Sequence, residues 1–138
     1  MTIELVPLCT FTGNTGTSFD LGRTPAGRRI VFKVSDGRIT GERLSGRQVG
    51  QVDGDWLTIG ADGVGTLDVR LLLETDDGAL VLIQYHGRVD TSTPNAPIYT
   101  APRFETGDER YAWLNTIQAV GKGTLDGTIL TYEVCEVR

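Results

Sequence analysis

The sequence predicts an all-β protein: a single antiparallel β-barrel domain over residues 1–138, with about eight or nine strands and one short helix near 107–115. Asp-Gly pairs, which supply the positive φ angles of tight hairpins, begin at residues 36, 53, 62, 77 and 126. Eighteen glycines separate short runs rich in Val, Ile, Leu and Thr, and no segment has a long helical apolar period. A closed barrel also removes exposed sheet edges, so it is favoured over an open sheet.

The expected elements follow one another between these turns. The predicted strands are 3–11, 29–34, 38–44, 56–59, 66–75, 79–88, 117–124 and 128–137. Residues 90–102 contain three prolines, which cannot continue a central ladder and therefore predict a long loop. Thr106 and Glu109 have the spacing of a capping box, with Thr106 as the N-cap of the short helix.

Composition and charge exclude several classes of function. The formal net charge of −5 is opposite to that of a protein that binds a phosphate backbone, so no nucleic-acid partner is expected. No apolar stretch approaches the roughly 20 residues needed to cross a bilayer, and residues 1–10 lack the pattern of a signal peptide. We therefore expect a cytoplasmic protein with no membrane partner.

Cofactor and metal motifs are also missing from the sequence. The two cysteines, Cys9 and Cys135, and the single histidine have no metal-ligand spacing, and reduced thiols are expected in a cytosol. There is no dinucleotide-binding glycine motif, Walker loop or nucleophile elbow. We expect no metal and no cofactor.

The segment 66–75 alternates strictly, so a strand here has one apolar and one charged face. The apolar face carries Leu67, Val69, Leu71 and Leu73. In a simple barrel this face points inward and the charges meet water. Alternatively, the barrel has a polar interior that holds a ligand, and another subunit covers its outside. Asp68 and Arg70 would then be a buried ion pair, which is costly unless it has a function. Because no turn or cap explains two charges in mid-strand, our hypothesis places them inside.

The turn after Thr75 leaves two registers open. A two-residue turn at 77–78 places Arg70 opposite Tyr85, whereas a three-residue turn at 76–78 with a bulge places Asp68 opposite His86. The second register gives the only imidazole a carboxylate that orients it, as general acid–base chemistry requires.

Two further regions each have two interpretations. A two-residue turn at 126–127 would set Tyr132 against Gly121, where the small partner either packs under the ring or opens an internal pocket with the phenol as donor. Seven basic residues against two acidic ones in the segment 23–47 indicate either an anionic ligand or an ordinary solvated strand face.

Several short motifs resemble one known family. They are Asp55-Trp56, Leu67-Asp68-Val69-Arg70, Tyr85-His86-Gly87, the run from Ala101 to Gly107, and Tyr111-Ala112-Trp113-Leu114-Asn115. Over nearly the whole chain the sequence resembles the family called domain of unknown function 3237, or uncharacterised protein family 0311. The resemblance implies a calycin-like or allene-oxide-cyclase-like barrel that is often oligomeric, so we expect a homo-oligomer. It supplies no settled reaction. Cys135 departs from the aromatic residue expected near the end.

The resemblance and the alternation together select the candidate site residues. The catalytic candidates are Asp68 or His86 as base and Arg70 as the group that stabilises a developing oxyanion, with Tyr85 assisting. The ligand-binding candidates are Tyr85, Tyr99, Glu105, Trp113, Asn115 and Tyr132.

We expect an interior site for a small, largely apolar carbonyl or phenolic ligand, with isomerase, cyclase or lyase chemistry that uses no cofactor. The alternatives are a non-catalytic carrier barrel and a structural homo-oligomer without a ligand.

Overall fold

The computed structural model describes all 138 residues, which form ten strands and one 3-10 helix. The elements are β1 (Leu5–Thr24), β2 (Gly27–Thr40), β3 (Gly46–Gln48), β4 (Gly54–Ile59), β5 (Val64–Thr75), β6 (Leu80–Asp90), β7 (Ile98–Thr100), β8 (Arg103–Glu105), η1 (Glu109–Thr116), β9 (Ala119–Asp126) and β10 (Ile129–Val137).

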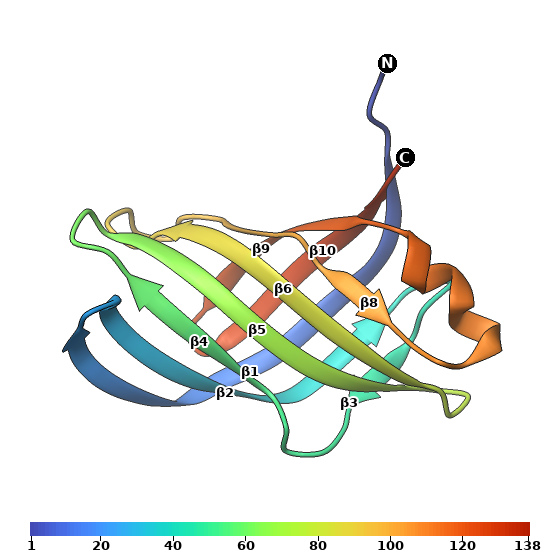
Figure 1. The fold of residues 1–138 in the computed structure, drawn as a ribbon, viewed down its shortest axis with the longest axis horizontal. Coiled ribbons are helices and arrows are strands. Elements are labelled where there is room, and N and C mark those ends of the chain that lie inside the picture. Colours follow the sequence, from blue (N-terminus) through green and yellow to red (C-terminus); the bar gives the residue numbers. More distant parts are fainter.

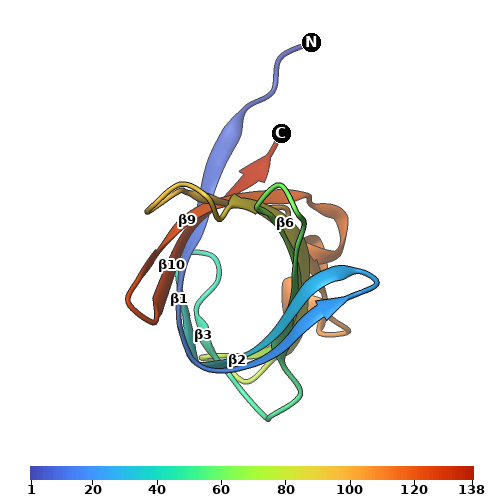
Figure 2. The same cartoon turned by 90° about the vertical axis from the view of Figure 1, so that its left-hand side faces the viewer.

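The strands form one antiparallel sheet that closes on itself. Its order is β3-β5-β4-β2-β1-β10-β9-β7-β6-β8, and the additional pairing of β5 with β6 completes the ring. Figure 1 shows the strands crossing obliquely, and Figure 2 shows the ring in a view from the end. The predicted all-β barrel with one short helix is confirmed. The helix does not meet the length and apolarity needed to cross a membrane.

The first hairpin is longer than predicted. β1 continues to Thr24 and pairs with β2. β2 contains the predicted strand 29–34 and residues 38–40 of the predicted strand 38–44, whereas residues 41–44 lie in no strand. Asp36, at φ 55°, therefore lies within β2 and does not form a hairpin turn. The β1–β2 register shifts at this point, so Asp36 lies in a bulge of the ladder. An Asp-Gly pair can form such a bulge as readily as it can form a turn. The pair at 53–54 also makes no hairpin, because β3 and β4 both pair with β5.

Two hairpin registers bear directly on the site. The β5–β6 turn has three residues with Gly78 at φ 93°, so Asp68 lies opposite His86, the second of the two expected registers. In the β9–β10 hairpin the loop is Gly127 and Thr128, one position later than predicted. Tyr132 consequently lies opposite Gly123 and not Gly121, although its partner is still a glycine.

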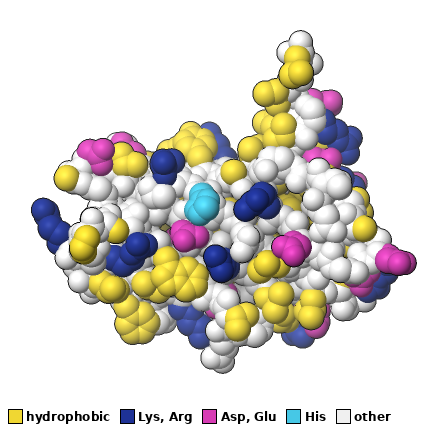
Figure 3. Space-filling model, viewed as in Figure 1, with side chains coloured by type: hydrophobic (Ala, Val, Ile, Leu, Met, Phe, Trp, Pro, Cys, Tyr) yellow, Lys and Arg dark blue, Asp and Glu magenta, His cyan; other side chains and the backbone are white.

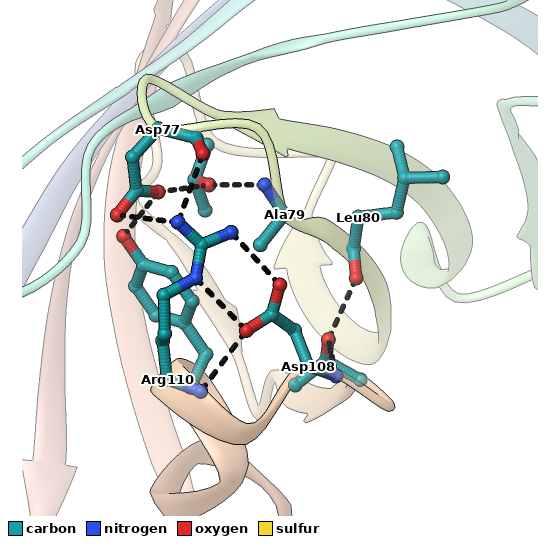
Figure 4. Close-up of polar contacts among 8 residues, drawn as sticks. Asp77, Ala79, Leu80, Asp108 and Arg110 are labelled. Carbon is teal, nitrogen blue, oxygen red and sulfur yellow. Dashed lines mark hydrogen bonds and ion pairs between the residues drawn. The ribbon is translucent and has the colours of Figure 1, made fainter.

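The helix begins two residues after the predicted capping box. Asp108 is the N-cap, and its carboxylate accepts a hydrogen bond from the Arg110 amide at 3.0 Å. Thr106 instead bridges two segments: its hydroxyl donates to the Leu80 carbonyl at 2.7 Å and accepts from the Asp108 amide. Arg110 also binds the carbonyl of Asp77 in the β5–β6 turn at 3.0 Å (Figure 4). These contacts fasten η1 to one end of the barrel, which we call the closed end.

Apolar side chains fill the barrel at this closed end. Leu44 and Leu114 are buried almost completely, and Val81 on β6 has no exposed surface. Leu71, Leu73 and Ile83 continue the same core toward the middle of the barrel. The opposite end, near the loop after β6, is built differently and holds the site.

Candidate functional site

The charged residues of mid-β5 lie on the outer face of the barrel. The side chains of Asp68 and His86 are 51% and 77% exposed, with His86 Nε2 3.5 Å from Asp68 Oδ1, and Arg70 is exposed as well. The prediction that Asp68 and Arg70 point into the interior is therefore wrong. The inward face belongs to the leucine and valine positions of β5, since burying apolar groups is favourable and burying charges is costly.

Four of the predicted ligand-binding residues also lie outside the interior. Tyr99 and Glu105 are exposed, and Trp113 packs beneath Arg43, whose guanidinium carbon is 5.0 Å from the ring centre. Asn115 accepts from the amide of Thr106 at 2.9 Å and donates to its carbonyl at 3.0 Å, so it fastens the end of η1 to the preceding loop. Only Tyr85 and Tyr132 of the predicted set lie inside the barrel.

The basic segment 23–47 is largely neutralised on the surface. Four of its seven basic residues form ion pairs: Arg28 with Asp20, Arg38 with Asp76, Arg43 with Glu136 and Arg47 with Glu74. This arrangement matches the solvated strand face, one of the two interpretations of that segment.

A cavity of about 350 Å³ occupies the half of the barrel away from η1. Its walls are mainly apolar and include Phe32, Val34, Leu57, Leu67, Val69, Val89, Ile98, Leu125 and Leu130. Its mouth is formed by the loop after β6, where Asp90, Thr91, Thr93 and Asn95 line it. We call this the open end.

A carboxyl group, that of Asp55, lies in this apolar cavity. The register places Asp55 in a row that crosses four strands, with Phe32 on one side and Val69 and then Tyr85 on the other. Asp55 Oδ1 accepts a hydrogen bond from the backbone amide of Asp68 at 3.1 Å. Burial raises the pKa of the Asp55 carboxyl to about 6, and the nearby Asp68 carboxylate acts in the same direction.

The local pairing explains why this carboxylate turns toward β5. The β4–β5 ladder pairs Asp55 with Val69 and Thr58 with Thr66 but leaves the two positions between them unpaired. The carbonyl of Trp56 accepts from Arg29 Nη1 at 2.9 Å. The Asp55 side chain thus satisfies a half-buried strand amide that would otherwise lack an acceptor in the chain.

Two tyrosines accompany Asp55 in the interior. The rings of Tyr85 and Tyr132 meet edge to face with centres 5.9 Å apart, and Phe11 stacks on Tyr132 at 6.2 Å. Gly123 lies directly under the Tyr132 ring and leaves no room for a Cβ atom. Burial raises the pKa of both phenols, so both stay protonated and can act as hydrogen-bond donors.

The Tyr132 hydroxyl is buried and makes no hydrogen bond of normal geometry within the chain, although the Tyr85 hydroxyl lies near it. Buried polar groups are nearly always paired, so an unpaired hydroxyl in the wall of a cavity can bond to a ligand oxygen once the side chains that cover it move. Asp55 can exchange a proton near neutral pH, and the two phenols can donate hydrogen bonds to an oxygen atom. The chain brings together no group of three potential metal ligands.

The sequence-based reasoning missed Asp55, although a signal was present. Asp55, Leu57 and Ile59 alternate, so the carboxyl lies on the apolar face of its strand. The predicted strand began at residue 56, which left Asp55 in a turn. A strand begun one residue earlier would have placed a carboxyl group on a buried face.

Comparison with known proteins gives a consistent family. A UPF0311 protein of Rhodopseudomonas palustris is 29% identical over an alignment 150 positions long, which covers 99% of this chain and 97% of that protein. The crystal structure of a beta-barrel like protein from Acinetobacter baumannii superposes with a TM-score of 0.91 at 29% identity, covering 100% and 98% of the two chains.

One relative has a named activity. The hydroalkoxylation enzyme phnH of Penicillium herquei is 32% identical over 108 residues, covering 77% of this chain and 64% of that enzyme. The family described as "Protein of unknown function (DUF3237)" matches residues 3–137. The chain therefore belongs to the DUF3237 family.

Proposed function

We propose that this protein is an acid–base enzyme that binds a small, largely apolar phenol or alcohol in the open end of the barrel and closes a ring by adding its hydroxyl group across a carbon–carbon double bond. The observation that carries the proposal is that one apolar cavity is lined both by the half-buried Asp55 carboxyl and by Tyr132, whose hydroxyl is buried without a hydrogen bond of normal geometry. The hydroalkoxylation enzyme among the relatives supports this reaction class.

The cavity defines the class of ligand. Its apolar walls favour a hydrocarbon or aromatic skeleton, because burial of such surface stabilises the complex by about 25 cal/mol per Å². The Tyr132 hydroxyl, which makes no hydrogen bond of normal geometry in the chain, selects a carbonyl or phenolic oxygen at the inner end of the ligand. A cavity of about 350 Å³ suits a compact molecule and not a long lipid.

In the proposed reaction the Asp55 carboxyl changes its protonation state twice. Protonated Asp55 donates its proton to one carbon of the double bond. The substrate hydroxyl oxygen bonds to the other carbon, and the hydroxyl proton passes to the Asp55 carboxylate, so the carboxyl is restored and no proton is gained or lost. With a pKa of about 6, about a tenth of the carboxyl groups are protonated at pH 7, compared with about one in a thousand for an ordinary aspartate.

The phenols would position the substrate. Tyr132 donates a hydrogen bond to a substrate oxygen and Tyr85 holds the Tyr132 ring from the side. The apolar walls exclude water, which would otherwise compete with the substrate hydroxyl for the cationic carbon.

The test uses the isosteric variant Asp55→Asn, which keeps the acceptor for the Asp68 amide. A panel of 2-allyl and 2-prenyl phenols is incubated with the protein, and cyclic ether is measured by chromatography. We expect turnover to fall at least 100-fold in Asp55→Asn, in the range typical for loss of a general acid. The control is Glu133→Gln, which makes the same charge change on the exposed face of β10 and leaves turnover unchanged.

Binding is measured separately with N-phenyl-1-naphthylamine, a neutral apolar fluorophore. Wild-type protein should enhance its fluorescence, and Ala96→Trp, which narrows the mouth of the cavity, should abolish the enhancement. Binding without turnover of any phenol in the panel would favour the carrier barrel. If Ala96→Trp binds the probe as well as wild type, the interior site is wrong.

A further inference from the structure

We propose a second binding site, for a carboxylate or phosphate group, on the outer face of the barrel where β5, β6 and β8 lie side by side. The register places Arg70 opposite Gln84 and Gln84 opposite Arg103, so the three side chains form one row across three strands. All three belong to a surface groove of about 410 Å³. We call it the arginine groove.

The arginines of this groove differ from most others on the surface. Arg28, Arg38, Arg43, Arg47, Arg110 and Arg138 each bind a carboxylate of the chain. Arg70 and Arg103 have no ion-pair partner and no hydrogen bond, and the side-chain amide of Gln84 between them is also unbonded. In a protein of net charge −5, two neighbouring arginines left without a carboxylate leave a local positive site.

The geometry suits one anionic group. Adjacent strands are about 4.8 Å apart, so the backbones of Arg70 and Arg103 lie about 10 Å apart with Gln84 midway between them. Two guanidinium forks at this spacing can reach inward to the same carboxylate or phosphate, while the Gln84 amide donates a third hydrogen bond. Gln118 is not available, because its amide nitrogen already binds the carbonyls of Pro102 and Ala119.

One acidic side chain of the groove opposes an anion. Asp68 lies two residues from Arg70 on the same face of β5, and its carboxylate is 3.5 Å from His86. Figure 3 shows the histidine in cyan between an acidic and several basic side chains on this face. The groove thus predicts a pattern of opposite signs: loss of either arginine weakens anion binding, and loss of the Asp68 charge strengthens it.

This site is separate from the interior cavity. Val69 and Tyr85 contribute to both depressions, but their side chains are buried and point into the barrel, so the sheet lies between the two sites. Failure of the proposed cyclisation therefore has no bearing on the groove.

The test is a titration of isotope-labelled full-length protein with inorganic phosphate, and separately with acetate, at constant ionic strength, followed by ¹H–¹⁵N spectra. We expect saturable shifts at residues 70, 84 and 103. Arg70→Gln and Arg103→Gln should each weaken binding at least tenfold, since each removes charge-assisted hydrogen bonds. Asp68→Asn should tighten it several-fold. Tighter binding of phosphate than of acetate would identify a phosphorylated ligand, and the reverse a carboxylate; both support the site.

The matched control is Arg88→Gln, which changes an exposed arginine on β6, the strand that carries Gln84; its guanidinium donates to the Thr66 hydroxyl at 2.8 Å. Its effect should be less than twofold. Absence of saturation with both anions, equal weakening by Arg88→Gln, or weaker binding in Asp68→Asn would each overturn the proposal. Unchanged melting temperatures in the variants exclude loss of folding as the cause of weaker binding.

Discussion

The two ends of the barrel are built from the same strands but differ in how they treat polar groups. At the closed end, Asp77 accepts hydrogen bonds from Thr75 at 2.6 Å and from Tyr111 at 2.8 Å, and Arg110 binds its carbonyl. At the open end, the Tyr132 hydroxyl is buried without a hydrogen bond of normal geometry and the Asp55 carboxyl remains in an apolar environment. The polar groups of the closed end are therefore paired, whereas the open end retains one unpaired hydroxyl and one carboxyl in apolar surroundings, and both cost stability.

The two ends differ in the side chains that fill the interior of the barrel. At the closed end, Leu114 of η1 belongs to the same buried core as the aliphatic side chains of β5 and β6, and it has no exposed surface. At the open end no helix covers the strands, and the interior row contains Asp55 and Tyr85 in place of two aliphatic residues. The closed end therefore has a filled core and the open end a cavity because only the closed end is covered by a helix and only the open end has Asp55 and Tyr85 at inward-facing positions.

The largest expected effect tests whether the closed end is more tightly packed than the open end. Leu114→Ala should lower the free energy of unfolding by about 3 kcal/mol, because it leaves a cavity in the tightly packed closed end. The matched change Leu125→Ala, at a residue that is 45% exposed at the open end, should cost less than about 1 kcal/mol. Urea unfolding measures both. Equal losses would show that the two ends are packed alike.

The next effect is a pH dependence caused by Asp55. Its pKa in the folded protein, about 6, lies above the ordinary value of 3.8, so folding disfavours the charged form. The penalty develops as the pH rises from 3.8 to about 6 and is complete above that range. Asp55→Asn should therefore be more stable than wild type above about pH 6, by up to about 3 kcal/mol, and equally stable below pH 3.8. A pH-independent difference in urea unfolding would contradict a buried, costly carboxylate.

A smaller effect concerns the position of Tyr132. A Cβ atom at Gly123 would overlap the Tyr132 ring, which is also held by Phe11. Gly123→Ala should cost about 2 kcal/mol and weaken binding of the apolar fluorophore, because the ring must move into the cavity. Gly107→Ala, at a position with no atom within 4 Å, is the control. Unchanged binding by Gly123→Ala would remove the Tyr132 ring from the wall of the site.

The smallest effect is expected at the exposed network of the closed end. Tyr111→Phe removes the hydrogen bond to Asp77 that, with the bond from Thr75, holds the pKa of the Asp77 carboxyl below its ordinary value. A lowered pKa contributes stability above pH 3.8 that is lost as the pH falls further, so the variant should melt slightly lower at neutral pH and equally at strongly acidic pH. Thermal melts at several pH values measure this. A loss that persists at strongly acidic pH would assign the effect to packing.

Most of the fold could be predicted, and the errors have local causes. The Asp-Gly pairs at 62, 77 and 126 mark real hairpins, but the pair at 36 lies within β2, since the same backbone angles serve a turn and a bulge. The capping box at Thr106 marked the approach to the helix, although Asp108 caps it. In both cases several residues could have formed the turn or the helix cap. Contacts with residues distant in the sequence decide which of them does so.

The candidate site was predicted only in part. The structure places Tyr85 and Tyr132 inside the barrel, as expected, but it places Asp68, Arg70 and His86 on the outer face. The alternation in β5 correctly predicted which residues share a face, but it did not determine which of the two faces points inward. The ordinary preference for buried leucine decided it, against our hypothesis of an enclosed ion pair. The homo-oligomer stays a prediction.

By itself, the sequence determined the class of fold, the pairing of β5 with β6 to within two registers, and the family, because these depend on local turns, alternation and short motifs. Only the tertiary structure decided that Asp55 shares a cavity with Tyr85 and Tyr132. Those residues come from three strands that lie far apart in the chain, and their depth depends on closure of the ring. Burial, and with it the raised pKa of a carboxyl group, is a property of all the strands around a site and not of the strand that carries it.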